Sequence, residues 1–387
     1  MRGRAWRGHR TVLIAIVSIF TVVLPVVIEA DPAAADQTLR PGFNLTRTDD
    51  VSQFVPNPTN FVFLPGTTNL IGIGKCGDIG LGRMPNADGL DKTQWSNISW
   101  PSENQVTCAP TDRGLLGVDV DGSTVYLLYD YTPGPGVACK DGTTTTNAAD
   151  GTAHIYGRLT KLTMNSATAP SSFSNEQVLI DCLPAFSADP GNDGHGDDSH
   201  TVGSVLVAPD HTLFVSNGEA SSYTVADTSA LNAQDIHSPR GKILHLTSTG
   251  SPAPGNPFSS DGNYWATRVF AYGFRNPFRF TLAPGSNSTL YLGDVGWNNR
   301  EEIDVSTGGE NFGWPCWEGP LSYRNAYSGM AACQAAYANP PANLKGPLYW
   351  WTHDVPADGH AALGGAFATG ADYGAYSGAF FFGDLEW

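Results

Sequence analysis

The sequence predicts an all-β protein built from repeated units of a turn and a strand. After the first 35 residues, no stretch sustains the apolar spacing of a helix. Short runs of β-branched and aromatic residues recur instead between turns rich in Gly and Pro, of which the chain has 44 and 27. With 41% hydrophobic residues, the chain has enough apolar material for a large core.

Residues 1–35 are predicted to be a signal peptide. Four arginines precede an uncharged run over 11–28, and Ala33 to Ala35 offer a cleavage site of small residues. An uncleaved membrane anchor is the alternative because the apolar run is long, but Pro25 and the small residues favour cleavage. We therefore expect a secreted or periplasmic protein with no stable membrane insertion after cleavage. Residues 36–60 are expected to form an N-terminal lead-in.

The charge of the chain excludes one class of partner. Its net charge is -16, and no Lys/Arg cluster occurs beyond the N-terminus. Nucleic acid needs a basic footprint, so we expect no nucleic-acid partner. An acidic surface suits an exported protein that binds cations such as calcium.

The chain contains 6 cysteines. In an exported protein, three disulfides are the default. Cys316 and Cys333 flank one loop and are the firmest predicted pair, whereas the connectivity of the other four remains open. No CxxC motif occurs, so neither a structural zinc site nor a thioredoxin-like site is supported.

The predicted elements share one form, a polar turn followed by a hydrophobic strand. Five copies occur, at 69–73, 123–129, 211–216, 288–293 and 377–383. Their separation of roughly 55 to 90 residues exceeds a compact β-propeller blade and implies long inserted loops. Such loops on a rigid propeller are where function concentrates. A propeller also protects its sheet edges by closing into a circle.

Two motif-based alternatives are weak. The segment from Gly72 to Gly77 matches the GxGxxG dinucleotide pattern, but the glycines and proline that follow cannot open the required helix. It is therefore interpreted as a glycine-rich strand end. No G-x-S-x-G elbow of a serine hydrolase occurs. Calcium-dependent propeller lactonases remain an open alternative of similar architecture.

A short polar loop at 194–200 holds two histidines and two aspartates directly before a strand. His200 at the mouth of that strand suits a general base at neutral pH. The loop could also supply a metal site. From these residues alone, a solvated acidic loop is the favoured interpretation.

An ordered series of motifs favours a functional role for His200 over a solvated loop. The segment from His200 to Glu219 is followed by RGKIL, GNPF, YGFRNP, GDVGW, EEID and GGENFGWP, which ends at Pro315. RGLLG at 113–117 lies upstream, and FFGD at 381–384 lies downstream. Together they resemble the glucose/sorbosone dehydrogenases. The resemblance implies a six-bladed β-propeller of the soluble quinoprotein glucose dehydrogenase type over residues 61–387.

The resemblance implies an oxidoreductase that oxidises aldose sugars or related polyols with pyrroloquinoline quinone and calcium. His200 falls on the family's catalytic base. Arg275 and Asn276 fall on the pair beside the quinone, where the charge of Arg275 would stabilise the negative oxygen of the reduced quinone. Gly296 and Trp297 fall where two backbone carbonyls hold calcium. The electron acceptor leaves no mark in the sequence.

Several positions depart from the family pattern. Asp112 stands near the cofactor where relatives carry Gln or Glu, and Ser199 stands where an acidic residue precedes the histidine. Trp297 replaces a frequent proline, which a carbonyl ligand tolerates. Arg275 could instead form a structural pair with Asp294.

Two further expectations follow. The alternative function is a non-catalytic propeller that binds a protein or carbohydrate ligand, as propellers resembling Hedgehog-interacting protein do. The fifth strand copy ends near Asp384, so the chain is expected to lack the sixth blade and to be a fragment, truncated in blade five to six.

Overall fold

The computed structural model describes residues 55–83, 94–108, 112–148, 151, 153–186, 199–353 and 361–385. The predicted signal peptide, most of the lead-in and residues 194–198 of the polar loop lie outside these residues. The first strand, β1 (Pro58–Phe63), crosses the domain boundary expected at residue 61.

The described strands form four sheets of four strands and one sheet of two. Consecutive strands pair antiparallel throughout each sheet. The first sheet contains β1, β2 (Leu70–Gly74), β3 (Ile79–Arg83) and β4 (Gln94–Asn97). The second contains β5 (Leu115–Asp121), β6 (Thr124–Tyr131), β7 (Tyr156–Met164) and β8 (Phe173–Pro184).

The third sheet contains β9 (Val202–Val207), β10 (Leu213–Asn217), β11 (Lys242–Leu246) and β12 (Val269–Tyr272). The fourth contains β13 (Pro277–Leu282), β14 (Leu290–Asp294), β15 (Arg300–Ser306) and β16 (Tyr349–Thr352). The fifth pairs β17 (Ala362–Phe367) with β18 (Phe380–Asp384).

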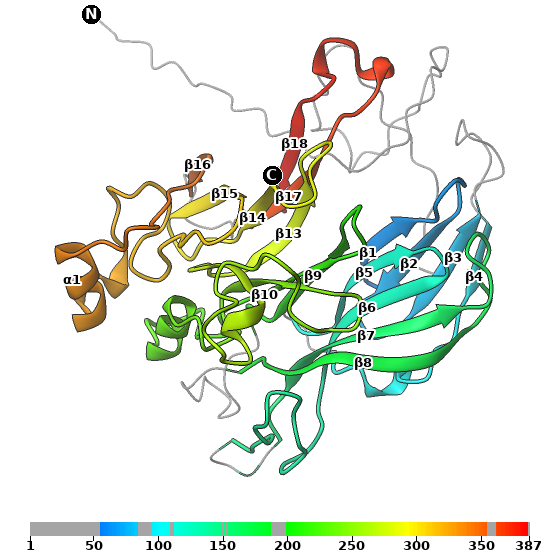
Figure 1. The fold of residues 1–387 in the computed structure, drawn as a ribbon, viewed down its shortest axis with the longest axis horizontal. Helices are drawn as coiled ribbons and strands as arrows, with labels where there is room; N and C mark the ends of the chain where they lie inside the picture. The colour runs from blue at the N-terminus through cyan, green and yellow to red at the C-terminus, as the bar shows by residue number, and fades with distance from the viewer. Residues whose placement is uncertain are drawn as a thin grey trace, which may run out of the picture.

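The sheets are arranged as the blades of a propeller. The first strand of each sheet contacts the first strand of the next, in the order β1, β5, β9, β13 and β17. Figure 1 shows these strands near the middle of the molecule, with β4 and β16 towards opposite sides. The predicted all-β propeller is therefore confirmed, with four complete blades and two strands of a fifth among the described residues.

The five predicted strand copies occupy equivalent places. They coincide with β2, β6, β10, β14 and β18, the second strand of every sheet. The glycine-rich segment at 72–77 is the end of β2 and its turn, and it leads into β3 rather than a helix. Both interpretations from the sequence are confirmed.

The hydrophobic core lies between neighbouring sheets. One cluster joins the first and second sheets, another the second and third, and a third joins the third and fourth. Along β6, Val125 and Leu127 face the first cluster, whereas Tyr126 and Leu128 face the second. Because both faces of a blade are covered, the strand is a continuous apolar run rather than an alternating one.

Helices are short in the described part of the chain. The one α-helix there is α1 (Ala331–Ala338), and 3-10 turns occur at Glu103–Gln105, Thr228–Gln234, Ala266–Arg268, Ala326–Gly329 and Ala371–Tyr376. The sequence did not predict α1. No described helix has the length and apolar character needed to cross a membrane.

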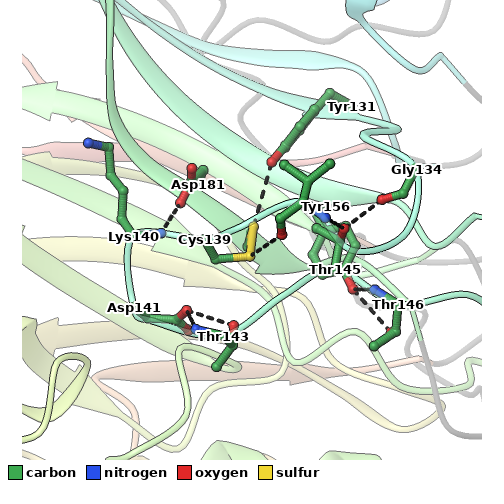
Figure 2. Close-up of a disulfide and its surroundings, with 12 residues drawn as sticks. Tyr131, Gly134, Cys139, Lys140, Asp141, Thr143, Thr145, Thr146, Tyr156 and Asp181 are labelled. Atoms are coloured by element: carbon green, nitrogen blue, oxygen red, sulfur yellow. Dashed lines mark hydrogen bonds between the residues drawn. A yellow bond between two sulfur atoms is a disulfide. The ribbon is translucent and has the colours of Figure 1, made fainter.

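All six cysteines form disulfides, as predicted. The pairs are Cys76–Cys108, Cys139–Cys182 and Cys316–Cys333. Figure 2 shows the second pair, which ties the connection between β6 and β7 to β8. Beside it, the Lys140 amide donates a hydrogen bond to Asp181 Oδ1 at 2.9 Å. The long inserted loop is thereby fastened to its own blade.

Candidate functional site

The alternation of strand direction brings the predicted site residues to one edge of the blades. In an antiparallel four-stranded blade, the start of the first strand and the connection between the second and third strands lie at the same end. Asp112 and His200 precede the first strands β5 and β9. Arg275 precedes the first strand β13, and Gly296 lies between β14 and β15.

His200 is buried and oriented by an acidic partner. Its side chain is only 4% exposed, and its Nδ1 lies 2.8 Å from Oε1 of the fully buried Glu219. The backbone of His200 has φ 56°, a left-handed conformation that few non-glycine residues adopt. A carboxylate at Nδ1 leaves Nε2 as the ring nitrogen that can accept a proton, and no described residue hydrogen-bonds Nε2.

The hairpin of β9 and β10 brings this pair together. Asn217 pairs with Val202 at the end of the ladder, and beyond it the amides of Gly218 and Ala220 donate to the carbonyls of Thr201 and His200. Between them Gly218 passes so close to His200 that a Cβ would overlap the His200 carbonyl. A glycine is therefore required at this position.

Asp112 supports the backbone of His200. Its Oδ2 accepts a hydrogen bond from the His200 amide at 2.9 Å. The neighbouring Thr201 hydroxyl donates to Oδ2 of Asp130 at 3.0 Å. Burial raises the pKa of Asp130 to about 7, against the opposing effects of its hydrogen bonds from the Gly114 amide and Thr201. The contact between Asp112 and a cofactor stays a prediction.

Arg275 lies next to the histidine pair. The amide of Glu219 donates to the Arg275 carbonyl at 2.9 Å. The Arg275 guanidinium donates through Nη1 to the carbonyls of Val295, at 3.1 Å, and Gly296. It also lies 5.6 Å from the ring centre of Trp314.

The predicted alternative pairing of Arg275 with Asp294 takes a different form. The backbone amides of Arg275 and Asn276 donate to Asp294 at 3.0 and 2.6 Å, whereas the guanidinium hydrogen bonds go to carbonyls. Burial raises the pKa of Asp294 to about 7 despite these amide hydrogen bonds. Asp294 thus orients the backbone of Arg275 and Asn276. The guanidinium of Arg275 donates to the carbonyls of Val295 and Gly296 instead.

The Trp297 side chain is held by a hydrogen bond and an aromatic contact. Its Nε1 donates to the Tyr223 carbonyl at 2.7 Å, and its ring centre lies 5.3 Å from that of Tyr327. Gly296 turns sharply, because a Cβ there would overlap the Arg300 carbonyl. Gly296 is therefore the second position at which only glycine fits.

The structure joins the predicted site residues through Glu219, which the sequence did not single out. Contacts run from Asp112 to His200, from His200 to Glu219, and from Glu219 to Arg275. Arg275 then contacts Gly296. Asn276 and Trp297 are the chain neighbours of Arg275 and Gly296. Glu219 ends the motif that begins at His200, but nothing in its local pattern marks it as the partner of His200.

The proposed calcium ligands are backbone oxygens. Among the described residues, no group of three or more His, Cys, Asp or Glu side chains could hold a metal. The Gly296 oxygen already accepts from the cationic Arg275, so this oxygen attracts positive charge. Calcium takes about six to eight oxygen ligands, and the carbonyls of Gly296 and Trp297 would supply two of them. The guanidinium and imidazole likewise fit an oxygen-rich, anionic cofactor.

The sequence of this chain matches a known protein family. The family model named Glucose / Sorbosone dehydrogenase matches residues 95–387, which is most of the chain. The chain belongs to the glucose/sorbosone dehydrogenase family. This confirms the resemblance that the ordered motifs indicated.

Two curated relatives of this family member are similar over part of their length. The aldose sugar dehydrogenase YliI of Escherichia coli is 28% identical over 207 residues, which are 54% of this chain and 47% of the relative. The HIPL2 protein of Arabidopsis thaliana is 31% identical over 137 residues, which are 31% of this chain and 19% of that protein. The chain thus spans less than half the length of either relative.

A solved structure shows the same fold. The aldose sugar dehydrogenase of Streptomyces coelicolor, in its PQQ-bound form, superposes with a TM-score of 0.52 and 18% identity. The match covers 80% of this chain and 74% of that structure. At this identity the likeness supports the propeller fold alone.

Proposed function

We propose that this member of the glucose/sorbosone dehydrogenase family is an exported quinoprotein that oxidises an aldose or related polyol. The observation that carries the proposal is the buried contact between His200 and Glu219, whose amide is hydrogen-bonded to the backbone carbonyl of Arg275. A base and a fixed cation at one edge of the blades are what oxidation of a hydroxyl by hydride removal requires.

In this proposal His200 accepts the proton of the sugar hydroxyl at Nε2. Glu219 holds the ring through Nδ1 and stabilises the imidazolium that forms. Asp112 fixes the backbone from which the ring projects. Because all three groups are held before substrate arrives, little reorganisation accompanies the proton transfer.

Pyrroloquinoline quinone, when bound, supplies the acceptor for the hydride. Arg275 and Asn276 would hold it, and the guanidinium would supply a fixed positive charge there. The carbonyls of Gly296 and Trp297 would hold calcium. The Streptomyces coelicolor enzyme, whose fold this chain shares, is solved in a PQQ-bound form, and the proposal extends that cofactor to this chain. Export is supported by the three disulfides, which form and persist in oxidising compartments.

The test follows dye reduction by the protein with pyrroloquinoline quinone, calcium and a panel of aldoses and polyols. We expect sugar-dependent reduction, a loss of about 10²- to 10⁴-fold for His200→Asn, and a smaller loss for Glu219→Gln. The control is His245→Asn. His245 lies on β11 of the third sheet and is also buried, but its ring is hydrogen-bonded to Asn256 and Thr212.

Three outcomes would contradict the proposal or the role of His200 in it. Absence of dye reduction with every sugar, together with no quinone uptake by absorbance titration, would favour a non-catalytic binding propeller. Hydrolysis of lactones without added quinone would favour a propeller lactonase. Equal losses in the His200→Asn and His245→Asn variants would remove His200 from the proposed role of base.

A further inference from the structure

One buried carboxylate binds the second part of the connection between β14 and β15. Glu318 is 1% exposed, and its Oε1 accepts hydrogen bonds from four consecutive backbone amides. The donors are Trp297 at 3.0 Å, Asn298 at 3.2 Å, Asn299 at 3.1 Å and Arg300 at 3.2 Å. Successive amides that converge in this way form an anion-binding concavity, and here a side chain of the same protein fills it.

Glu318 is itself held in place. Its Oε2 accepts from Asn325 Nδ2 at 3.3 Å, and the next amide, that of Gly319, donates to Glu302. A buried charge without such partners would be strongly destabilising, whereas several amide donors together stabilise a buried carboxylate. The arrangement is therefore a specific local structure that depends on the carboxylate.

The geometry of the peptide bond links Glu318 to the proposed cation ligands. In a planar trans peptide, the N–H and the preceding C=O point in opposite directions. The amide of Trp297 shares its plane with the carbonyl of Gly296, and the amide of Asn298 shares its plane with the carbonyl of Trp297. Since Glu318 binds both amides, both carbonyls point away from it. The Gly296 carbonyl accordingly meets the guanidinium of Arg275.

We propose that Glu318 is a positioning residue that directs the carbonyls of Gly296 and Trp297 into the cation site. The inference rests on the proposed function, because it assigns those two oxygens to calcium. Glu318 touches neither ion nor substrate and acts through the backbone. Without its charge, the four amides are left with a weaker, neutral acceptor, and the two carbonyls are held less firmly.

The test compares Glu318→Gln with the wild-type protein. Calcium binding is followed by terbium luminescence sensitised through tryptophan, with calcium as competitor. We expect affinity to fall by about 10- to 100-fold, the usual effect of removing a group that orients a metal ligand. Amide hydrogen exchange at residues 297–300 should also become faster in the variant, whether or not calcium is present. Glu318→Asp keeps the charge with a shorter reach and should give an intermediate effect.

Glu310→Gln is the matched control. Glu310 also accepts backbone amides, those of Thr307 and Gly308, but at the far end of β15. Its variant should leave calcium affinity unchanged. Unchanged exchange at 297–300 in Glu318→Gln would overturn the inference. Absence of calcium binding in the wild type would overturn the calcium part of the proposed function and the inference with it. If Glu318→Gln had faster amide exchange at 297–300 but unchanged calcium affinity, Glu318 would hold the backbone without positioning the calcium ligands, and the inference would be wrong.

Discussion

At the scale of single residues, the site depends on groups held in unfavourable states. His200 keeps a left-handed backbone, which costs of order 1–3 kcal/mol in a non-glycine residue. The contacts with Asp112 and Glu219 maintain it. Beneath them, Asp130 is fully buried and its Oδ1 has no hydrogen-bond partner. Such groups reduce stability in exchange for a preorganised site.

Asp130 should make stability depend on pH. Burial raises its pKa from 3.8 to about 7, so between these values the folded protein binds more protons than the unfolded chain. The contribution of Asp130 to the free energy of unfolding is present at pH 4 and is lost as pH rises through 7. Asp130→Asn removes this loss, so the stability of the wild type relative to the variant should fall by about 4 kcal/mol between pH 4 and pH 8. Urea unfolding at both pH values measures it.

Asp261→Asn is the control for this prediction. A hydrogen bond from His237 lowers the pKa of the exposed Asp261, so its contribution changes with pH in the opposite direction. If the free energy of unfolding had the same pH dependence in the wild type and in Asp130→Asn, the raised pKa of Asp130 would be contradicted.

At the scale of elements, the segment 314–333 supports the site from outside the blades. Trp314, Tyr327 and the disulfide Cys316–Cys333 form one buried cluster, against which Trp297 packs. The same segment carries Glu318. Since the segment has little regular structure, with only short helices in and next to it, its position depends on the disulfide and this cluster.

Removal of the Cys316–Cys333 disulfide should therefore affect both stability and the site. A double Cys→Ser variant frees a loop with a sequence separation of 17, which corresponds to a loss of about 3 kcal/mol. We also expect weaker calcium binding, measured by terbium luminescence. The double Cys→Ser variant of Cys139 and Cys182 is the control, because it should lose stability without weaker calcium binding. Equal calcium affinity in all three proteins would contradict the supporting role.

At the scale of the whole molecule, Arg279 connects three blades. From β13 its guanidinium donates to the Gly203 carbonyl of β9 and the Thr59 carbonyl of β1, both at 2.9 Å. Burial lowers the pKa of Arg279 to about 9. The first strands therefore meet around a charged side chain as well as around apolar contacts.

Arg279→Met should weaken the association of the blades. The variant keeps the apolar stem but leaves buried carbonyls without donors, so we expect the free energy of unfolding to fall by about 2–3 kcal/mol. Arg268→Met is the control, since Arg268 donates to Gly250 and Tyr264 within the third blade. Urea unfolding with limited proteolysis would show whether β1 is released first. A more stable Arg279→Met protein would mean that burial of the charge costs more than its hydrogen bonds contribute.

The sequence by itself determined the blades, the pairing of Cys316 with Cys333 and the order of the site motifs. These features depend on local patterns: a turn followed by a strand, a loop flanked by two cysteines, and short runs with a characteristic spacing. Only the tertiary structure decided that Glu219 is the partner of His200 and that Glu318 holds the loop after Gly296. The register of β9 and β10 shifts between Val215 and Asn217, close to the point where the chain brings Glu219 to the ring of His200. Bulges and contacts between distant segments depend on how whole blades pack, which no local pattern specifies.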